Sequence, residues 1–176
     1  MDLQEILNDK SVKPKEKTEA LCKWVMDNPK KINDIVGFAM AAKDPIKATC
    51  IEALEFATKN NPKIATITVL EFVSKALTEK APRVKWEAAK VVGNIASVFP
   101  GDLDEAIKNL LTNSEHSGTV VRWSAAFALG EIIKLKTPHN KELIPAIEAI
   151  CNREEKNSIK KIYLAALKKA NPVSKK

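Results

Sequence analysis

Glycine and aromatic residues are both scarce in this chain. There are five glycines in 176 residues, against about 7% in average proteins. Gly-rich phosphate loops and many-turned β-sheets both need more glycine than this. The aromatic residues are three Trp, one Tyr and five Phe. The sequence therefore disfavours a phosphate-loop enzyme and any β-rich fold.

Cysteines are also few, and long apolar runs are missing. Cys22, Cys50 and Cys151 are an odd number at wide spacing, which fits neither a disulfide framework nor a zinc motif. Residues 1–5 show neither the basic nor the apolar part of a secretory signal, and no apolar run is long enough to span a bilayer. We therefore expect a cytoplasmic protein with free thiols and no membrane partner.

Hydrophobic residues make up 45% of the chain and charged residues 29%, so the chain can bury a core and is not disordered by composition. Ala, Lys, Leu and Glu abound, and these residues favour helices. An all-α fold is predicted.

The net charge of +7 is concentrated at one end. Residues 155–176 hold seven Lys against one acid, and the other 154 residues sum to only +1. Lys outnumbers Arg 26 to 3, whereas base-edge and bidentate phosphate contacts favour Arg. A solvated charged terminus explains this charge, with nucleic-acid binding as the alternative.

Prolines reveal an internal repeat. Successive spacings of 33, 38, 38 and 34 residues separate five prolines: Pro29, Pro62, Pro100, Pro138 and Pro172. Each ends one helical pattern, and the first four are placed to open the next. We predict repeats at about 1–28, 29–61, 62–99, 100–137 and 138–171, with a tail at 172–176, in a single domain.

Each repeat contains two helical patterns. They are predicted at about 2–9, 14–27, 31–42, 45–60, 63–79, 82–98, 102–113, 119–136, 140–152 and 157–170. The second pattern recurs most clearly: residues 84–93 read VKWEAAKVVG and residues 121–130 read VRWSAAFALG. Weaker copies begin at Ile46 and Ile159. Apolar residues along residues 121–132 form one stripe, and the small Ala and Gly residues allow close helix stacking.

These motifs resemble HEAT repeats. The run from Val121 to Gly130 matches the second-helix signature of that family, and residues 143–150, with an internal proline at Pro145, resemble its first helix. An acidic residue shortly before the Val–Arg pair is also typical of the family, and four residues fill that slot here: Asp44, Glu79, Glu115 and Glu154. The resemblance implies a right-handed α-solenoid, or α-α superhelix, in which the second helices line the concave surface.

Four cations occupy one repeat position and should form a row: Lys47, Lys85, Arg122 and Lys160. In the family this position commonly pairs with the acidic residue of its own or a neighbouring repeat. The alternative is a strip that meets an acidic peptide or phosphate.

An aromatic pair follows the row by one residue. Trp86 and Trp123 are register-equivalent and lie off the apolar stripe, with Lys90 and Phe127 four residues later. Aromatic side chains beside cations are typical of an interaction hot spot, although both indoles can instead pack between repeats. Armadillo arrays that bind nuclear-import peptides carry Asn at the position of Lys90 and Phe127, so that function is not indicated.

Catalysis has little support in the sequence. His116 and His139 fall in predicted turns without a Cys or carboxylate partner at a typical spacing. Some HEAT-like proteins are DNA glycosylases for alkylated bases, which need an Asp beside aromatic residues; here the second helices offer Glu87.

Together these features predict a monomeric, non-enzymatic scaffold without cofactors or metals. We expect it to bind a protein partner on the concave face, and an acidic segment of that partner is one candidate for the contact. The candidate residues are Lys47, Lys85, Trp86, Lys90, Arg122, Trp123, Phe127 and Lys160. A nucleic-acid binder related to the alkylpurine glycosylases is the alternative.

Overall fold

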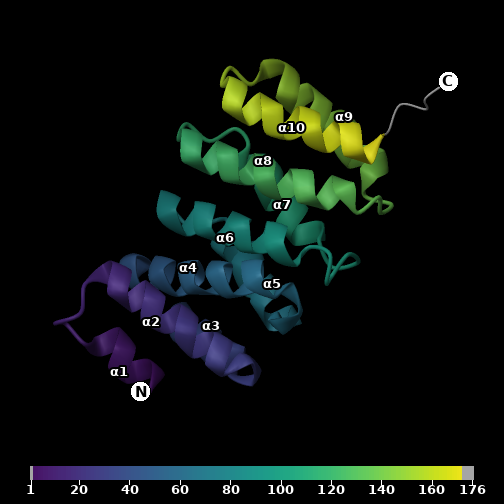
Figure 1. Ribbon diagram of the computed structural model, residues 1–176. Coiled ribbons are helices and arrows are strands. Elements are labelled where there is room, and N and C mark those ends of the chain that lie inside the picture. Colours follow the sequence, from purple (N-terminus) through teal and green to yellow (C-terminus); the bar gives the residue numbers. More distant parts are fainter. Residues whose placement is uncertain (1, 172–176) are drawn as a thin grey trace.

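The structure, a computed structural model, describes residues 2–171 and is shown in Figure 1. Over this range the chain forms ten α-helices and two 3₁₀ helices, and no strand. The predicted all-α fold is therefore confirmed, while the predicted tail at 172–176 and Pro172 lie outside the described residues. The α-helices are α1 (Leu3–Asn8), α2 (Pro14–Asp27), α3 (Ile32–Ala41), α4 (Asp44–Asn60), α5 (Ile67–Ala76), α6 (Pro82–Ile95), α7 (Asp104–Asn113), α8 (Thr119–Lys134), α9 (Asn140–Arg153) and α10 (Asn157–Ala170).

The helices pair in chain order and the pairs stack one after another (Figure 1). The second helix of each pair packs against the second helix of the next, in the order α2, α4, α6, α8 and α10. Among the first helices, α3 packs on α5 and α5 on α7. We call the solvent-exposed side of α2, α4, α6, α8 and α10 the second-helix face.

The core lies between the two rows of helices and repeats with the sequence motif. Leu54, Val92 and Leu129 occupy equivalent positions of α4, α6 and α8, and all three are fully buried. The core continues without a break from α1 to α10. No single pair buries its own apolar residues, so each repeat depends on its neighbours for stability.

Proline begins several helices, but not where the repeat spacing placed it. Pro14, Pro45 and Pro82 lie in the first turn of the second helices α2, α4 and α6, where a missing N–H costs nothing. By contrast, Pro29 and Pro62 open the 3₁₀ helices Pro29–Lys31 and Pro62–Ile64.

The prediction that the repeat prolines open the first α-helices is therefore wrong in detail. Pro100 and Pro138 lie in turns ahead of α7 and α9. The reason is visible at α5, where the Thr66 hydroxyl accepts a hydrogen bond from the Val69 amide at 3.4 Å. This side-chain cap starts the helix at Ile67, five residues after Pro62.

Two glycines allow the second helices to approach each other closely. A Cβ built on Gly93 of α6 would lie 2.5 Å from Cε1 of the Phe127 ring on α8. A Cβ built on Gly130 of α8 would lie 3.1 Å from the Cβ of Ala166 on α10. The small residues of the repeat motif therefore set the distance between successive repeats.

We expect the same substitution to have opposite effects at two helical glycines. Gly37→Ala on α3 meets no atom within 4 Å and should stabilise the protein by about 0.5–1 kcal/mol, because Ala favours helix. Gly93→Ala should destabilise it by about 1–3 kcal/mol, because the new methyl group overlaps the Phe127 ring. Urea denaturation of both variants measures the two changes. When Phe127 is already replaced by Ala, adding Gly93→Ala should cost much less than it costs in the wild type. Equal effects at the two sites would contradict this account of Gly93.

Candidate partner-binding surface

Two of the four row cations are engaged in ion pairs between repeats. The Nζ of Lys47 on α4 lies 2.8 Å from Oε1 of Glu79, which belongs to the next repeat. The Nε of Arg122 on α8 lies 3.0 Å from Oε2 of Glu154, again in the next repeat. Both pairs span 32 residues of sequence, so the same interaction recurs two repeats apart.

The other two row cations have different surroundings. Lys85 donates to the Leu77 carbonyl at 3.0 Å and to Oδ1 of Asn113 at 3.3 Å. Burial lowers the pKa of Lys85, and the nearby Glu79 carboxylate opposes that shift. Lys160 is half-buried, and no carboxylate of residues 2–171 lies within ion-pair distance of it. The row is thus built largely into the contacts between repeats.

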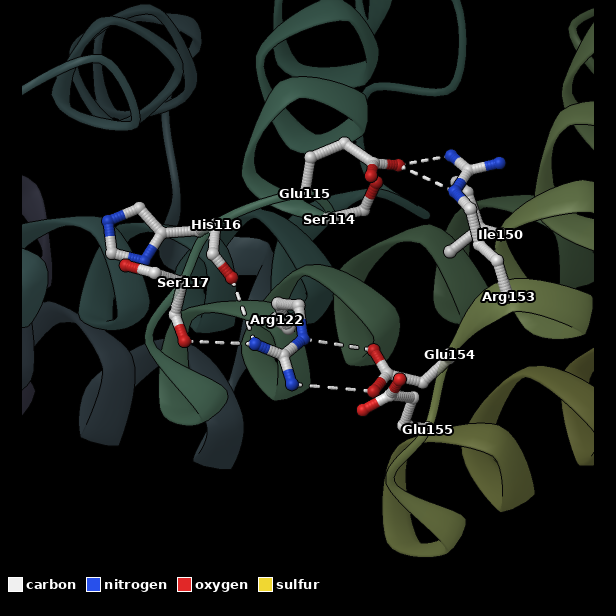
Figure 2. Close-up of a pocket in the computed structure, with 9 residues that line it drawn as sticks. All are labelled: Ser114, Glu115, His116, Ser117, Arg122, Ile150, Arg153, Glu154 and Glu155. Carbon is white, nitrogen blue, oxygen red and sulfur yellow. Dashed lines mark hydrogen bonds and ion pairs between the residues drawn. The ribbon is translucent and has the colours of Figure 1, made fainter.

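Arg122 is the best anchored of the row, as Figure 2 shows. It lies between the α7–α8 turn and the α9–α10 turn, and its Nη1 donates to the carbonyls of His116 and Ser117 at 2.9 and 3.0 Å. Across the same pocket, Glu115 pairs with Arg153 (Figure 2). Every one of these bonds joins the fourth repeat to the fifth or closes a turn of the fourth.

The acidic positions of the motif therefore have separate partners. Glu79 and Glu154 pair with the cation of the preceding repeat, whereas Glu115 pairs with Arg153 instead of Lys85. Asp44 is exposed at the start of α4 and forms no ion pair with any described residue.

Glu154 is held ionised by its hydrogen bonds. Its side chain is 4% exposed, and burial alone would raise its pKa. Hydrogen bonds from Arg122 and from the backbone amide of Lys156 outweigh burial, and the pKa of Glu154 lies below its ordinary value. The charged form of this carboxylate therefore stabilises the junction between the last two repeats.

A second ionic cluster connects α4 with α6 on the second-helix face. Nζ of Lys90 lies 3.0 Å from Oε2 of Glu87 and 3.8 Å from Oε2 of Glu55, and both acids are buried. Beside them Arg83 pairs with Glu52 at 2.7 Å. Lys90, a predicted contact residue, is therefore already neutralised by the protein itself.

Glu55 is the acid of this cluster whose ionised form is disfavoured by its surroundings. Burial raises the pKa of Glu55, the positive charge of Lys90 lowers it, and the carboxylate of Glu87 raises it further; the net shift is upward. Its ionised form is therefore less favourable in the folded chain than in water.

The aromatic residues lie together on the second-helix face. The rings of Trp123 and Phe127 stack on α8, with centroids 6.2 Å apart and planes 8° from parallel. Trp123 is 40% exposed, and Phe127 is half-buried against Gly93. Trp86 is half-buried on α6, and its indole N–H donates to Oε1 of Glu87 at 2.8 Å. Trp123 is thus the most accessible of the three predicted aromatic residues.

One further exposed residue extends this apolar surface, and the sequence interpretation missed it. Val120 lies one turn before Trp123 on α8 and is 51% exposed. The spacing of three residues between Val120 and Trp123 already indicated that both lie on one side of the helix. Val120 was overlooked because it adjoins Val121, which belongs to the buried motif.

The remaining reactive side chains are dispersed. All three cysteines are free, and burial raises the pKa of Cys50 to about 12. His116 accepts a hydrogen bond from the Gly118 amide, and His139 lies 3.5 Å from Asp104. Within residues 2–171 no group of three His, Cys, Asp or Glu residues is placed to hold a metal. The helices of this range include none with the length and apolar character needed to cross a membrane.

Comparison with known proteins identifies the architecture. A designed armadillo repeat protein in complex with the peptide (KR)4 superimposes with a TM-score of 0.70 at 19% identity, over 96% of this chain and 80% of that one. This chain has an armadillo-like repeat fold. The predicted helical repeat solenoid is therefore confirmed.

Other engineered proteins share the solenoid. One engineered protein from a structural genomics consortium matches with a TM-score of 0.76 at 19% identity, over 97% of this chain and 80% of that one. A computationally designed armadillo protein for modular peptide recognition matches with a TM-score of 0.64 at 18% identity, over 96% and 81%. No family model matches the chain, and no curated protein does. At such identities the likeness describes the fold alone.

We expect Glu154→Gln to destabilise the solenoid at neutral pH by about 1–3 kcal/mol, because the buried charge partner of Arg122 is removed. Because the pKa of Glu154 is lowered in the folded state, its ionised carboxylate stabilises the protein above pH 4.5. This stabilisation is lost as the pH falls through the folded-state pKa. The stability gap between wild type and variant should therefore shrink below pH 4.5. Urea denaturation over a pH series measures it, and a gap that does not change with pH would contradict the role of the charge.

Glu55→Gln should behave in the opposite way. The folded pKa of Glu55 is raised above 4.5, so its contribution to stability is present at lower pH and is lost as the pH rises through the folded value. The variant, which keeps the Lys90–Glu87 pair, should therefore be more stable relative to wild type above the folded-state pKa of Glu55. The same pH series tests this, and a variant that becomes relatively weaker as the pH rises would refute it.

Proposed function

We propose that this chain is a non-enzymatic scaffold that binds a protein partner on its second-helix face, centred on Trp86, Trp123 and Phe127. The observation that carries this proposal is the exposure of Trp123, stacked on Phe127, beside a helix, α6, whose cations Arg83 and Lys90 are already paired. Large aromatic side chains that are partly exposed and held rigid are the usual centre of a protein interface.

Rigidity supports the proposal because it lowers the entropic cost of binding. The Phe127 ring is fixed from below by Gly93 and from the side by Trp123. The Trp86 indole is fixed by its hydrogen bond to Glu87. Because these rings lose little conformational entropy on binding, most of the free energy of their apolar contacts contributes to the affinity for the partner.

Ion pairing favours a protein partner over nucleic acid. A strip for phosphates would need the row cations free, but Lys47 and Arg122 are neutralised by Glu79 and Glu154. Two of the similar structures are described as a complex with a peptide and as a protein for modular peptide recognition. Their shared architecture is consistent with a face that accepts a polypeptide segment.

The test is affinity capture from a lysate of the native host, with and without nuclease, followed by mass spectrometry. A defined protein should remain bound after nuclease treatment and should be lost with Trp86→Ala/Trp123→Ala, since loss of two central aromatics typically costs about 2 kcal/mol or more, roughly 30-fold in affinity.

Phe56→Ala is the matched control. Phe56 is also an exposed aromatic residue on the second-helix face, but it lies on α4, and its exposed fraction is 50%. Its removal should leave capture unchanged, and thermal unfolding should show that all variants remain folded. Capture that disappears with nuclease, or that survives the double substitution in a folded variant, would overturn the proposed function.

A further inference from the structure

We infer that the segment bound by this face is acidic and carries apolar anchors. Its apolar side chains contact Val120, Trp123 and Phe127 of α8, and its carboxylates contact Lys161 and Lys169 of α10. This inference rests on the proposed function and adds the chemistry of the partner.

The apolar half of this surface is a stripe on α8. Val120, Trp123 and Phe127 stand three and four residues apart, on one side of the helix. Val120 and Trp123 are 51% and 40% exposed. Beyond the stripe, Glu131 and Lys134 pair with each other, so the C-terminal part of α8 offers no free charge to a partner. The stripe therefore provides apolar contact but does not discriminate between acidic and basic ligands.

The charged half lies on α10. This helix contains four lysines and no acidic residue. Lys161, Lys168 and Lys169 are exposed, and no carboxylate of the described residues 2–171 lies within ion-pair distance of them. On α6, in contrast, Arg83 and Lys90 are both paired. Of these two helices that flank α8, it is therefore α10 that presents exposed, unpaired lysines beside the stripe.

The two halves are neighbours. In the repeat register Lys161 of α10 is equivalent to Trp123 of α8, and Lys169 is equivalent to Glu131. Gly130 packs against Ala166 and Ile162, so the turn of α8 before Gly130 lies level with the turn of α10 that contains Lys161.

The position between the lysines is open. Ala165 occupies on α10 the register position that Phe127 occupies on α8, and Ala165 is exposed. No large side chain therefore stands at this position of α10. The nearest acid in sequence, Glu155, is exposed in the turn before α10.

This pattern selects against a basic ligand and distinguishes the chain from the designed armadillo protein that holds the peptide (KR)4. Lysines repel such a peptide and attract carboxylates, while the aromatic stripe requires apolar side chains. Nucleic acid would satisfy the lysines but would leave the stripe without apolar partners.

The experiment is selection of a random dodecapeptide library on the purified chain, followed by fluorescence titration of the enriched peptides. We expect enriched peptides to combine Asp or Glu with Leu, Phe or Trp. Their affinity should fall about tenfold or more with Trp123→Ala. It should also fall several-fold with Lys161→Glu, less with Lys161→Gln, and not at all with Lys108→Glu. Lys108 is an exposed lysine on the first helix α7, and its substitution is the matched control for net charge.

The outcomes separate this inference from the proposed function. Peptides that are neutral or basic, or that bind Lys161→Glu as well as wild type, overturn the acidic partner; if they still lose affinity with Trp123→Ala, the proposed function stands. Binders that ignore both substitutions count against both. A library without binders overturns the inference, and the capture experiment still decides the proposed function. Displacement of the peptides by a DNA duplex that is itself lost with Lys161→Glu would assign the α10 lysines to nucleic acid and overturn the inference.

Discussion

Close contact between successive second helices is the constraint on which this molecule depends. α6 meets α8 where the Phe127 ring covers Gly93, and α8 meets α10 where Ala166 covers Gly130. Every longer-range feature follows from this spacing, because it brings residues more than thirty positions apart into ion-pair distance. At the α6–α8 contact it also fixes the position of the Phe127 ring. The small residues of the motif are thus as decisive for the surface as for the core.

Sequence periodicity predicted the ten helices and their pairing, because a repeat imposes the same apolar stripe in each copy. It did not predict the helix start after Pro62, since the local cap at Thr66 decides it. Nor did it decide between the two interpretations of the cation row. Whether Arg122 meets Glu154 depends on how far one repeat is displaced along the next, and a one-dimensional pattern does not contain that displacement.

The candidate surface, too, was predicted from the sequence only in part. The register of Trp86 and Trp123 followed from the motif, but their unequal exposure and the hydrogen bond from the Trp86 indole to Glu87 did not, since both depend on the packing of the folded array. Lys90 looked like a free cation beside an aromatic ring and proved to be paired with acids from two helices. The lysines of α10 were visible as a terminal charge cluster. Their place beside the α8 stripe required the folded array.

The bonds around Arg122 have a consequence for how the array unfolds. In a linear array, each repeat is coupled only to its neighbours, and a terminal repeat has a single neighbour. Arg122–Glu154 and Glu115–Arg153 are both bonds across that last junction. They set how cooperatively the fifth repeat opens with the fourth, and hence how often α10 separates from α8 while the rest of the solenoid stays intact. Acidification weakens this coupling, because it protonates Glu154, the carboxylate that pairs with Arg122.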